Sequence, residues 1–261
     1  MRIDLKGKNA LVGGSSKGIG KAISERLAAS GANVTLMARD EKKLNKIVQS
    51  LDKKQGQSHK ILVVDFSDYN NFSKIISTFF SKNKIDILVN NTQGPPAGGA
   101  VEKNIDDYQV AFDLLFKCAV LSSSLAIQHM QNNDWGRIIN VASISVKEPL
   151  NYLVLSNSIR AALTTWAKSL SVDVAVNNVT VNNILTGYFD TERIEQLNSK
   201  KAEKMKIPMS DVRRTMEESV PMKRLGKPEE YANLVCFLAS QQASYITGTN
   251  IPIDGGLLKS L

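Results

Sequence analysis

Cysteine and histidine are scarce in this sequence. Its 261 residues include two cysteines and two histidines. Cys118 and Cys236 lie far apart in apolar stretches without a CxxC spacing, so we expect two reduced core residues rather than a disulfide or a metal site. His59 and His129 form no metal-binding pattern. These absences predict no metal and a reducing, cytoplasmic location.

Signals for a membrane or a nucleic acid are also lacking. The N-terminus, MRIDLKGKNALVGG, is charged and has no secretory apolar core. We expect no apolar run long enough to span a bilayer. No zinc-finger spacing, RNA-binding signature or basic heptad accompanies the net charge of +8. That charge indicates either a solvated lysine-rich surface or attraction to an anionic partner, such as a phosphorylated cofactor or an acidic carrier protein.

Short β-rich runs alternate with longer helical patterns along the chain. Most of these runs are continuously apolar, which is typical of parallel strands covered on both faces. The alternation predicts an α/β fold, a doubly wound parallel sheet with helices on both faces, in one domain spanning 1–261. Strands are predicted to begin at Asn9, Asn33, Lys60, Ile85, Arg137, Val179 and Tyr245, and helices to span 18–30, 41–54, 69–82, 105–132, 152–176 and 228–240.

Two stretches interrupt this rhythm, a Gly/Pro loop over 90–99 and a long insertion over 186–221. In such folds ligands bind at the carboxyl ends of the strands. Both stretches follow predicted strands, so we expect them to form pocket walls, with 186–221 as a substrate lid. The lysines within 198–206 could receive an acidic substrate or form a solvated helix face.

A glycine-rich loop joins the first predicted strand to the first helix. In LVGGSSKGIGKAI the glycines permit a tight turn and a close approach of the backbone to a phosphate, and the helix N-terminus adds free N–H groups. This position matches that of a dinucleotide-binding fingerprint, although the spacing is GxxxGxG. The residues expected to contact the cofactor are Gly14, Ser16, Lys17, Gly18, Ile19 and Gly20.

The end of the second predicted strand bears on the type of cofactor. A carboxylate at this tip would favour NAD, but the sequence reads Ala38 and then Arg39. Arg39 and Lys17 together could clamp a 2′-phosphate, which favours NADP (NADPH) over NAD. Asp40 could cap the next helix or bind the ribose, and the second alternative keeps NAD open.

These motifs resemble those of the short-chain dehydrogenase/reductase family over essentially the whole chain. GGSSKGIG resembles its TGxxxGIG, with Gly13 in place of Thr, and LVNNTQG resembles its NNAG segment. The C-terminal stretch from Val220 to Gly256 is similar to its C-terminal signature. The resemblance implies an NAD(P)-binding Rossmann fold with a seven-stranded sheet, usually in a homotetramer, although a dimer is also open.

The resemblance also implies further site residues. Asp65 and Phe66 would lie beside the adenine, while Gly187 and Thr191 would border the nicotinamide. Family members transfer a hydride between nicotinamide and a small-molecule carbonyl or alcohol. The resemblance further implies cofactor contacts from Asn90 and Asn91.

The family's catalytic positions are largely substituted here. Ser143 matches its substrate-binding Ser, but the Tyr position falls on Ser156, the Lys position on Arg160 and the Asn position on Leu115. A Ser hydroxyl is a far weaker acid than a phenol, whereas Arg can still bind ribose hydroxyls and supply a positive field. Ser156 and Arg160 lie four residues apart, which places them on one helix face.

Three replacements for the missing proton donor remain open. They are Tyr188, Tyr152, and a water held by Ser143 and Ser156. The first functional hypothesis is an NADP(H)-dependent oxidoreductase with a variant proton-transfer set, resembling 3-oxoacyl-carrier-protein reductases or sugar and alcohol dehydrogenases. The second is a catalytically inactive dinucleotide-binding sensor or scaffold.

Overall fold

Seven parallel strands form the centre of the molecule, in the order β3-β2-β1-β4-β5-β6-β7. The computed structural model describes residues 3–260. Seven strands are confirmed, but two begin later than predicted. The fourth begins at Ile87 rather than Ile85. The last begins at Asn250 rather than Tyr245, because Tyr245 is fully exposed and Gly248 turns the chain at φ +68°. The strands are β1 (Asn9–Gly13), β2 (Asn33–Ala38), β3 (Lys60–Val63), β4 (Ile87–Asn90), β5 (Gly136–Val141), β6 (Val179–Thr186) and β7 (Asn250–Ile253).

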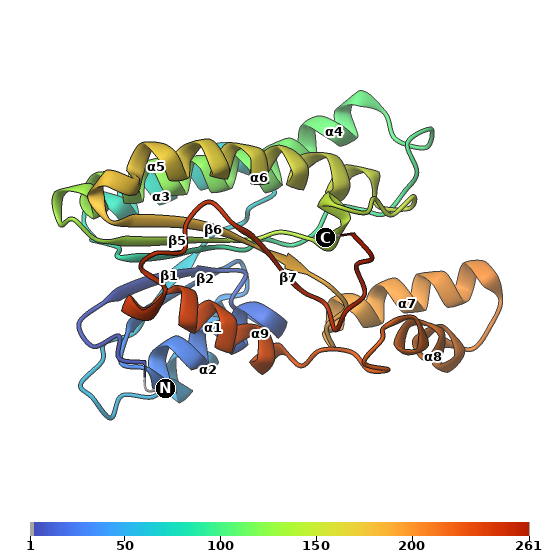
Figure 1. The fold of residues 1–261 in the computed structure, drawn as a ribbon, viewed down its shortest axis with the longest axis horizontal. Coiled ribbons are helices and arrows are strands. Elements are labelled where there is room, and N and C mark those ends of the chain that lie inside the picture. The colour runs from blue at the N-terminus through green and yellow to red at the C-terminus, as the bar shows by residue number, and fades with distance from the viewer. Residues whose placement is uncertain (1–2, 261) are drawn as a thin grey trace.

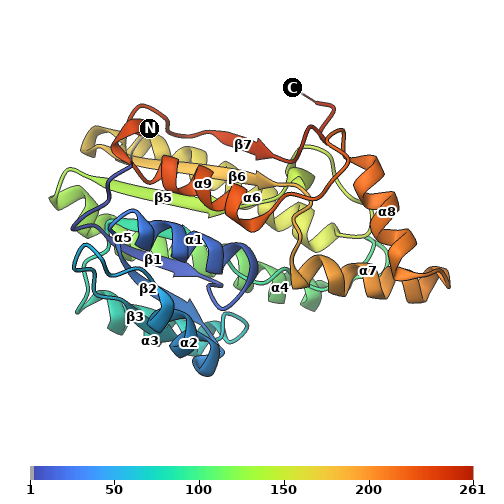
Figure 2. The ribbon, with the colours of Figure 1, turned by 90° about the horizontal axis from the view of Figure 1, so that it is seen from below.

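Helices cover both faces of this sheet, as the continuous apolar runs predict. One face carries α3 (Tyr69–Phe80), α5 (Cys118–Asn132) and α6 (Val154–Val174), and the other carries α1 (Gly18–Ala29), α2 (Glu41–Ser50) and α9 (Pro228–Leu238) (Figures 1 and 2). Neighbouring side chains of β1 enter different cores, Leu11 under the first layer and Val12 under the second. Both are fully buried, so β1 needs apolar residues at successive positions.

A long helical run precedes β5. It consists of α4 (Ile105–Phe112), a π-helical turn over Asp113–Lys117, and α5. By length and composition Ile105–Asn132 could cross a bilayer, which corrects the expectation that no run is long enough. The side chains of Cys118, Ala126 and Met130 are instead buried against the sheet. A helix that covers a parallel sheet needs much the same apolar composition as a membrane span.

The insertion over 186–221 folds into two helices at the carboxyl edge of the sheet. They are α7 (Glu192–Met205) and α8 (Met209–Ser219), at the right of Figure 1. Thr191 caps α7, because its hydroxyl accepts a hydrogen bond from the Ile194 amide. Lys206, at φ +54°, ends the helix in the left-handed conformation.

Asparagine side chains link four neighbouring strands inside the sheet. Asn90 donates to Asn140, Asn140 to Asn183, and Asn183 to Asn250, each over 2.8 Å. These positions are in register on β4, β5, β6 and β7. The chain of hydrogen bonds satisfies polar groups that would be costly to bury alone, and it holds the Asn90 side chain within the sheet.

Candidate active site

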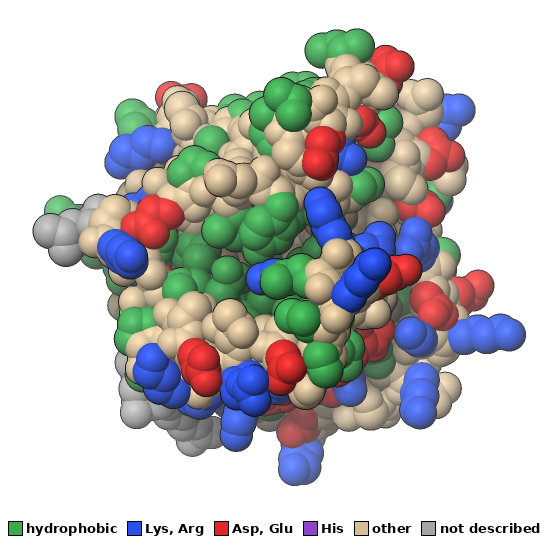
Figure 3. Space-filling model, turned by 90° about the vertical axis from the view of Figure 1, so that its right-hand side faces the viewer, with side chains coloured by type: hydrophobic (Ala, Val, Ile, Leu, Met, Phe, Trp, Pro, Cys, Tyr) green, Lys and Arg blue, Asp and Glu red, His purple; other side chains and the backbone are tan. Residues whose placement is uncertain are grey.

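A cleft of about 510 Å³ lies at the carboxyl edge of the sheet. Its walls come from the loops after β1, β2, β3, β4, β5 and β6, together with α6 and α7. The face of the molecule that carries α7 and α8 is hollowed, with hydrophobic side chains in the hollow and charged side chains of both signs around it (Figure 3). Because the strand order reverses between β1 and β4, this edge is where a doubly wound sheet binds ligands.

The glycine loop forms one end of this cleft. Gly14 and Gly18 have φ of +57° and +51°, which other residues rarely adopt. A Cβ atom at Gly14 would lie 2.8 Å from Asn91 Nδ2, and one at Gly20 would collide with the Gly14 carbonyl oxygen. The loop can adopt this conformation only because Gly14 and Gly20 have no side chains. It leads into the N-terminus of α1, where the backbone N–H groups can bind a phosphate. These features fit a dinucleotide.

Charged side chains surround the part of the cleft beyond β2 and β3. The Arg39 guanidinium lies 3.9 Å from the Asp65 carboxylate. Hydrogen bonds from Ser67, and then the charge of Arg39, lower the pKa of Asp65. Asp40 caps α2 by accepting from the Lys43 amide, which confirms its predicted capping role. Arg39 is largely exposed, so it is accessible to a ligand phosphate.

Lys17 connects the glycine loop to α7. Its Nζ lies 2.6 Å from Glu192 Oε2, in the first turn of α7. This hydrogen bond lowers the pKa of Glu192. The Thr191 side chain also lies against Gly18, 3.3 Å from where a Cβ would stand. Lys17 thus lines the cleft but is paired with Glu192 rather than grouped with Arg39.

Ser143 stands at the end of β5 with its hydroxyl oxygen already engaged. It accepts hydrogen bonds from the Ser145 amide at 3.1 Å and from the Ser145 hydroxyl at 2.9 Å. Since both lone pairs are in use, the Ser143 proton is left to be donated. Ser143 lines the cleft, so that proton is available to an oxygen bound there.

Arg160 lies deeper, with only 9% of its surface exposed. Its Nη1 donates to the Val141 carbonyl oxygen at the end of β5. Burial lowers the pKa of Arg160 to about 10, and the nearby charge of Arg193 acts in the same direction. Arg160 is still protonated at neutral pH, so it places a fixed positive charge in the cleft.

Ser156 and Arg160 both line the cleft from α6, which confirms that they share one helix face. Leu115 lies in the π-helical turn and is buried. It faces a small cavity of about 10 Å³ that Arg160 also borders. A leucine there offers no hydrogen-bonding group for a water.

The two candidate tyrosines lie together outside the cleft lining. Partial burial and the neighbouring Tyr188 raise the pKa of Tyr152 to about 12. Tyr152 is also 46% exposed. Neither tyrosine is among the described residues that line the cleft.

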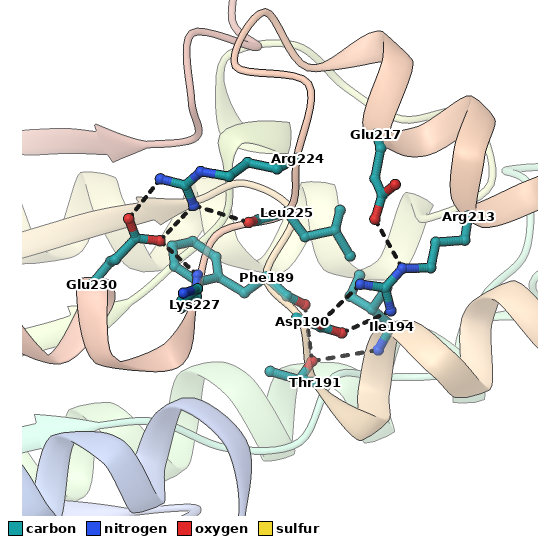
Figure 4. A network of polar contacts seen from close by, with 10 residues as sticks. All are labelled: Phe189, Asp190, Thr191, Ile194, Arg213, Glu217, Arg224, Leu225, Lys227 and Glu230. Atoms are coloured by element: carbon teal, nitrogen blue, oxygen red, sulfur yellow. Dashed lines mark hydrogen bonds and ion pairs between the residues drawn. The ribbon is translucent and has the colours of Figure 1, made fainter.

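Ion pairs within the insertion join α8 to the segment that precedes α7 (Figure 4). Arg213 of α8 donates to both carboxylate oxygens of Asp190, at 3.0 and 2.9 Å, and through Nε to Glu217 at 2.9 Å. Arg224 forms a similar two-point contact with Glu230 at the start of α9. The Gly226 amide donates to the Tyr188 carbonyl oxygen, and the Gly226 carbonyl oxygen accepts from the Asp190 amide, each at 2.9 Å. The segment between β6 and α7 is therefore held by α8 and by the loop before α9, which positions the residues at the start of α7.

The structure brings most of the predicted site residues into one cleft. Among the catalytic candidates, Tyr152 and Tyr188 lie elsewhere, and among the cofactor candidates Asn90 is held in the sheet. Arg193 also lines the cleft, but the sequence did not predict it, because its position depends on how α7 packs against the loop after β4. The predicted residues that line it are Gly14, Ser16, Lys17, Gly18, Ile19, Gly20, Arg39, Asp65, Phe66, Asn91, Ser143, Ser156, Arg160, Gly187 and Thr191.

A glycine loop, a helix N-terminus and a cleft at the switch point of a doubly wound sheet define a Rossmann-type dinucleotide-binding protein. The family model described as enoyl-(acyl carrier protein) reductase matches residues 14–258. The chain therefore belongs to the short-chain dehydrogenase/reductase family, as its motifs predict.

Relatives of known activity match this chain over nearly its whole length. The NADPH-dependent reductase BacG of Bacillus subtilis is 32% identical over 97% of this chain and 99% of its own. The 3-oxoacyl-[acyl-carrier-protein] reductase FabG of Rickettsia conorii is 34% identical over 98% and 99%. The structure of L-sorbose reductase from Gluconobacter frateurii, complexed with NADPH and L-sorbose, is 31% identical with a TM-score of 0.92, covering 100% of both chains.

Proposed function

We propose that this protein is an NADPH-dependent reductase that acts on a small-molecule carbonyl compound, or on the corresponding alcohol in reverse, without the family's tyrosine. One observation carries the proposal: a single cleft joins the glycine loop to Ser143, whose hydroxyl proton is free to be donated. The reductase relatives support this class of reaction.

NADPH is the proposed cofactor. The loop from Gly14 to Gly20 would hold the pyrophosphate, Arg39 and Lys17 the 2′-phosphate, and Arg160 the nicotinamide ribose. BacG is described as NADPH-dependent and L-sorbose reductase binds NADPH, which supports this choice. For Lys17 to reach a phosphate, its ion pair with Glu192 must open.

The part of the cleft lined by Ser143, Ser156 and Arg160 would bind the substrate and support hydride and proton transfer. When bound, the nicotinamide provides the hydride. Ser143 would donate a hydrogen bond to the substrate oxygen, and the charge of Arg160 would stabilise the negative charge that develops there. Arg160 does not release its own proton. We therefore assign proton delivery to a water held by Ser143 and Ser156, ahead of Tyr188 and Tyr152.

Reduction of a carbon–carbon double bond conjugated to a carbonyl is a second candidate. The described residues that line the cleft include no tyrosine, histidine or cysteine. Hydride addition to such a bond leaves an enolate, which is less basic than the alkoxide from a ketone and therefore needs a weaker acid. Ser143 and Arg160 would stabilise the enolate oxygen, and water would protonate the carbon. The description of the matching family model supports this candidate.

The test begins with fluorescence titrations of NADPH and NADH. The NADPH complex is then offered matched ketones, aldehydes and conjugated enones while absorbance at the nicotinamide band is followed. We expect tighter binding of NADPH and turnover of one substrate class; the product distinguishes the two reactions. NADPH binding without turnover, combined with activity only in Ser156→Tyr/Arg160→Lys, would instead identify a nucleotide-binding sensor or scaffold.

A cytoplasmic location and assembly as a homotetramer or homodimer remain predictions. Light scattering coupled to size-exclusion chromatography measures the assembly, and a monomer at micromolar concentration would contradict it.

A further inference from the structure

The ionic groups of the cleft are unequally paired. Each carboxylate in its lining has a cation of its own: Glu192 pairs with Lys17 at 2.6 Å, Asp65 with Arg39 at 3.9 Å, and Asp40 with Lys43 at 4.0 Å. Two guanidinium groups in the same lining, those of Arg160 and Arg193, form no ion pair with any residue in 3–260. The lining of the cleft therefore carries two positive charges without a carboxylate partner in that range.

Arg193 bridges the two walls of the cleft. It lies in the first turn of α7, and its Nη2 donates to the Pro95 carbonyl oxygen in the loop after β4, at 2.9 Å. A Cβ atom at Gly94 would stand 3.3 Å from Nη2 and 3.7 Å from Nε, so the absence of a side chain at Gly94 makes room for the guanidinium. Only one of the five N–H donors of Arg193 has a partner among the described residues.

The environment makes an unpaired charge costly. Burial lowers the pKa of Arg193, and the Arg193 charge in turn acts on buried Arg160. A partly buried cation with free donors is commonly compensated by a ligand anion when no protein carboxylate is present. The planar fork of a guanidinium matches a carboxylate by two parallel hydrogen bonds.

We propose that Arg193 binds a carboxylate of the substrate, so that the enzyme reduces a small oxo acid or an unsaturated acid. This inference rests on the proposed function, since it names the substrate class of the same site. Its neighbour Glu192 contacts the glycine loop through Lys17, whereas Arg193 contacts Gly94 and Pro95 in the loop after β4. The one hydrogen bond of Arg193 to a described residue is therefore made to a different loop from the one that leads into the α1 N-terminus, where a cofactor pyrophosphate would bind.

The first experiment measures binding without turnover. The protein is saturated with NADP⁺ and titrated with three acids, pyruvate, acetoacetate and benzoylformate, and with their methyl esters. We expect at least one acid to bind about 10- to 100-fold more tightly than its ester, the range for hydrogen bonds to a charged group. In Arg193→Gln this preference should disappear, and Arg193→Lys should retain part of it. Lys200→Gln, on the exposed surface of the same helix, is the matched control and should retain all of it.

Every other result overturns the inference. Equal binding of all acids and esters by the wild type would rule out a carboxylate subsite. A preference that persists in Arg193→Gln would assign it to another residue. A tenfold loss of NADPH affinity in Arg193→Gln with an unchanged acid preference would place the cofactor's pyrophosphate on Arg193. These titrations need no turnover, so they can show a carboxylate preference even if the protein is not a reductase. Conversely, turnover of neutral ketones alone would contradict the carboxylate subsite but leave the reductase proposal intact.

Discussion

The two ends of the cleft differ in the part of the chain that does the binding. At the glycine loop the backbone approaches a ligand, and what matters is that Gly14 and Gly20 have no side chains. At the far end the side chains of Ser143, Ser156 and Arg160 face the cavity. Family motifs are retained at the first end and largely replaced at the second.

This difference shows how cofactor binding and proton transfer can be separated. A phosphate cradle depends on backbone geometry, and almost any added side chain disrupts it. Proton transfer depends on one group with a suitable pKa. Exchanging Tyr and Lys for Ser and Arg therefore removes an acid while it leaves donors and a positive charge. Variants at the two ends should accordingly affect different constants.

The largest effect is expected at Ser143. Ser143→Ala should lower kcat/KM by about 10²- to 10³-fold, as for the loss of one donor to a developing oxyanion, while the Kd of NADPH stays within twofold. Steady-state kinetics and a fluorescence titration measure the two values. Ser124→Ala, an exposed serine on α5, is the control and should match the wild type. An unchanged kcat/KM in Ser143→Ala would show that the Ser143 hydroxyl does not contribute to the reaction.

The glycine loop should show the opposite behaviour. Gly14→Ala places a Cβ 2.8 Å from Asn91 Nδ2, so we expect NADPH affinity to fall by more than about tenfold, beyond the 1–2 kcal/mol of strain at positive φ. Gly56→Ala is the matched control, because Gly56 also has positive φ, at +84°, but has nothing within 4 Å of its Cβ. Thermal unfolding and NADPH titration separate the effects. Equal losses of affinity in both variants would mean that strain alone is responsible.

A smaller effect on NADPH affinity is expected where Glu192 of α7 contacts Lys17 of the glycine loop. Glu192→Gln removes the partner of Lys17, whose ion pair is largely exposed, so NADPH should bind about two- to fivefold more tightly and NADH should be unaffected.

Arg39→Ala should reduce the preference for NADPH over NADH by about tenfold, because Arg39 would no longer bind the 2′-phosphate. Titrations at two salt concentrations test both, since the gain in Glu192→Gln should shrink at high salt. A gain that is equal for NADH would exclude a role in 2′-phosphate binding.

The smallest effect is expected at the tyrosine pair. Because the pKa of Tyr152 is raised to about 12, its hydroxyl stays protonated between pH 7 and 10 and its ionisation cannot shape the rate there. Tyr152→Phe should change kcat less than twofold and leave the pH–rate profile unaltered. Tyr188→Phe should also change kcat less than twofold, because Tyr188 is not among the described residues that line the cleft. A 100-fold loss in either variant would return that tyrosine to the role of proton donor.

Much of the fold follows from local patterns. The bounds of β1 and β2 are read directly from NALVG and NVTLMA, because a strand buried on both faces has apolar residues at successive positions. The error at β7 has a local cause as well: TGTN continues the β-like composition, but only the fold exposes Tyr245 and turns the chain at Gly248.

Long-range packing decides which of the predicted site residues reach the cleft. Asn90 and Asn91 are neighbours in one motif, yet Asn90 bonds to Asn140 inside the sheet while Asn91 lines the cleft. Successive side chains at a strand end point to opposite sides, so only strand pairing decides which one meets a ligand. The same holds for Tyr152 and Tyr188, which meet each other.

The sequence by itself determined the sheet, the glycine loop and the changed catalytic positions, because each depends on residues close together in the chain or at regular spacing. Only the tertiary structure decided which charges are paired. Lys17 and Glu192 are 175 residues apart, and Arg193 and Pro95 are 98 residues apart. These contacts depend on α7 packing against the loops after β1 and β4, and no local sequence pattern specifies that packing.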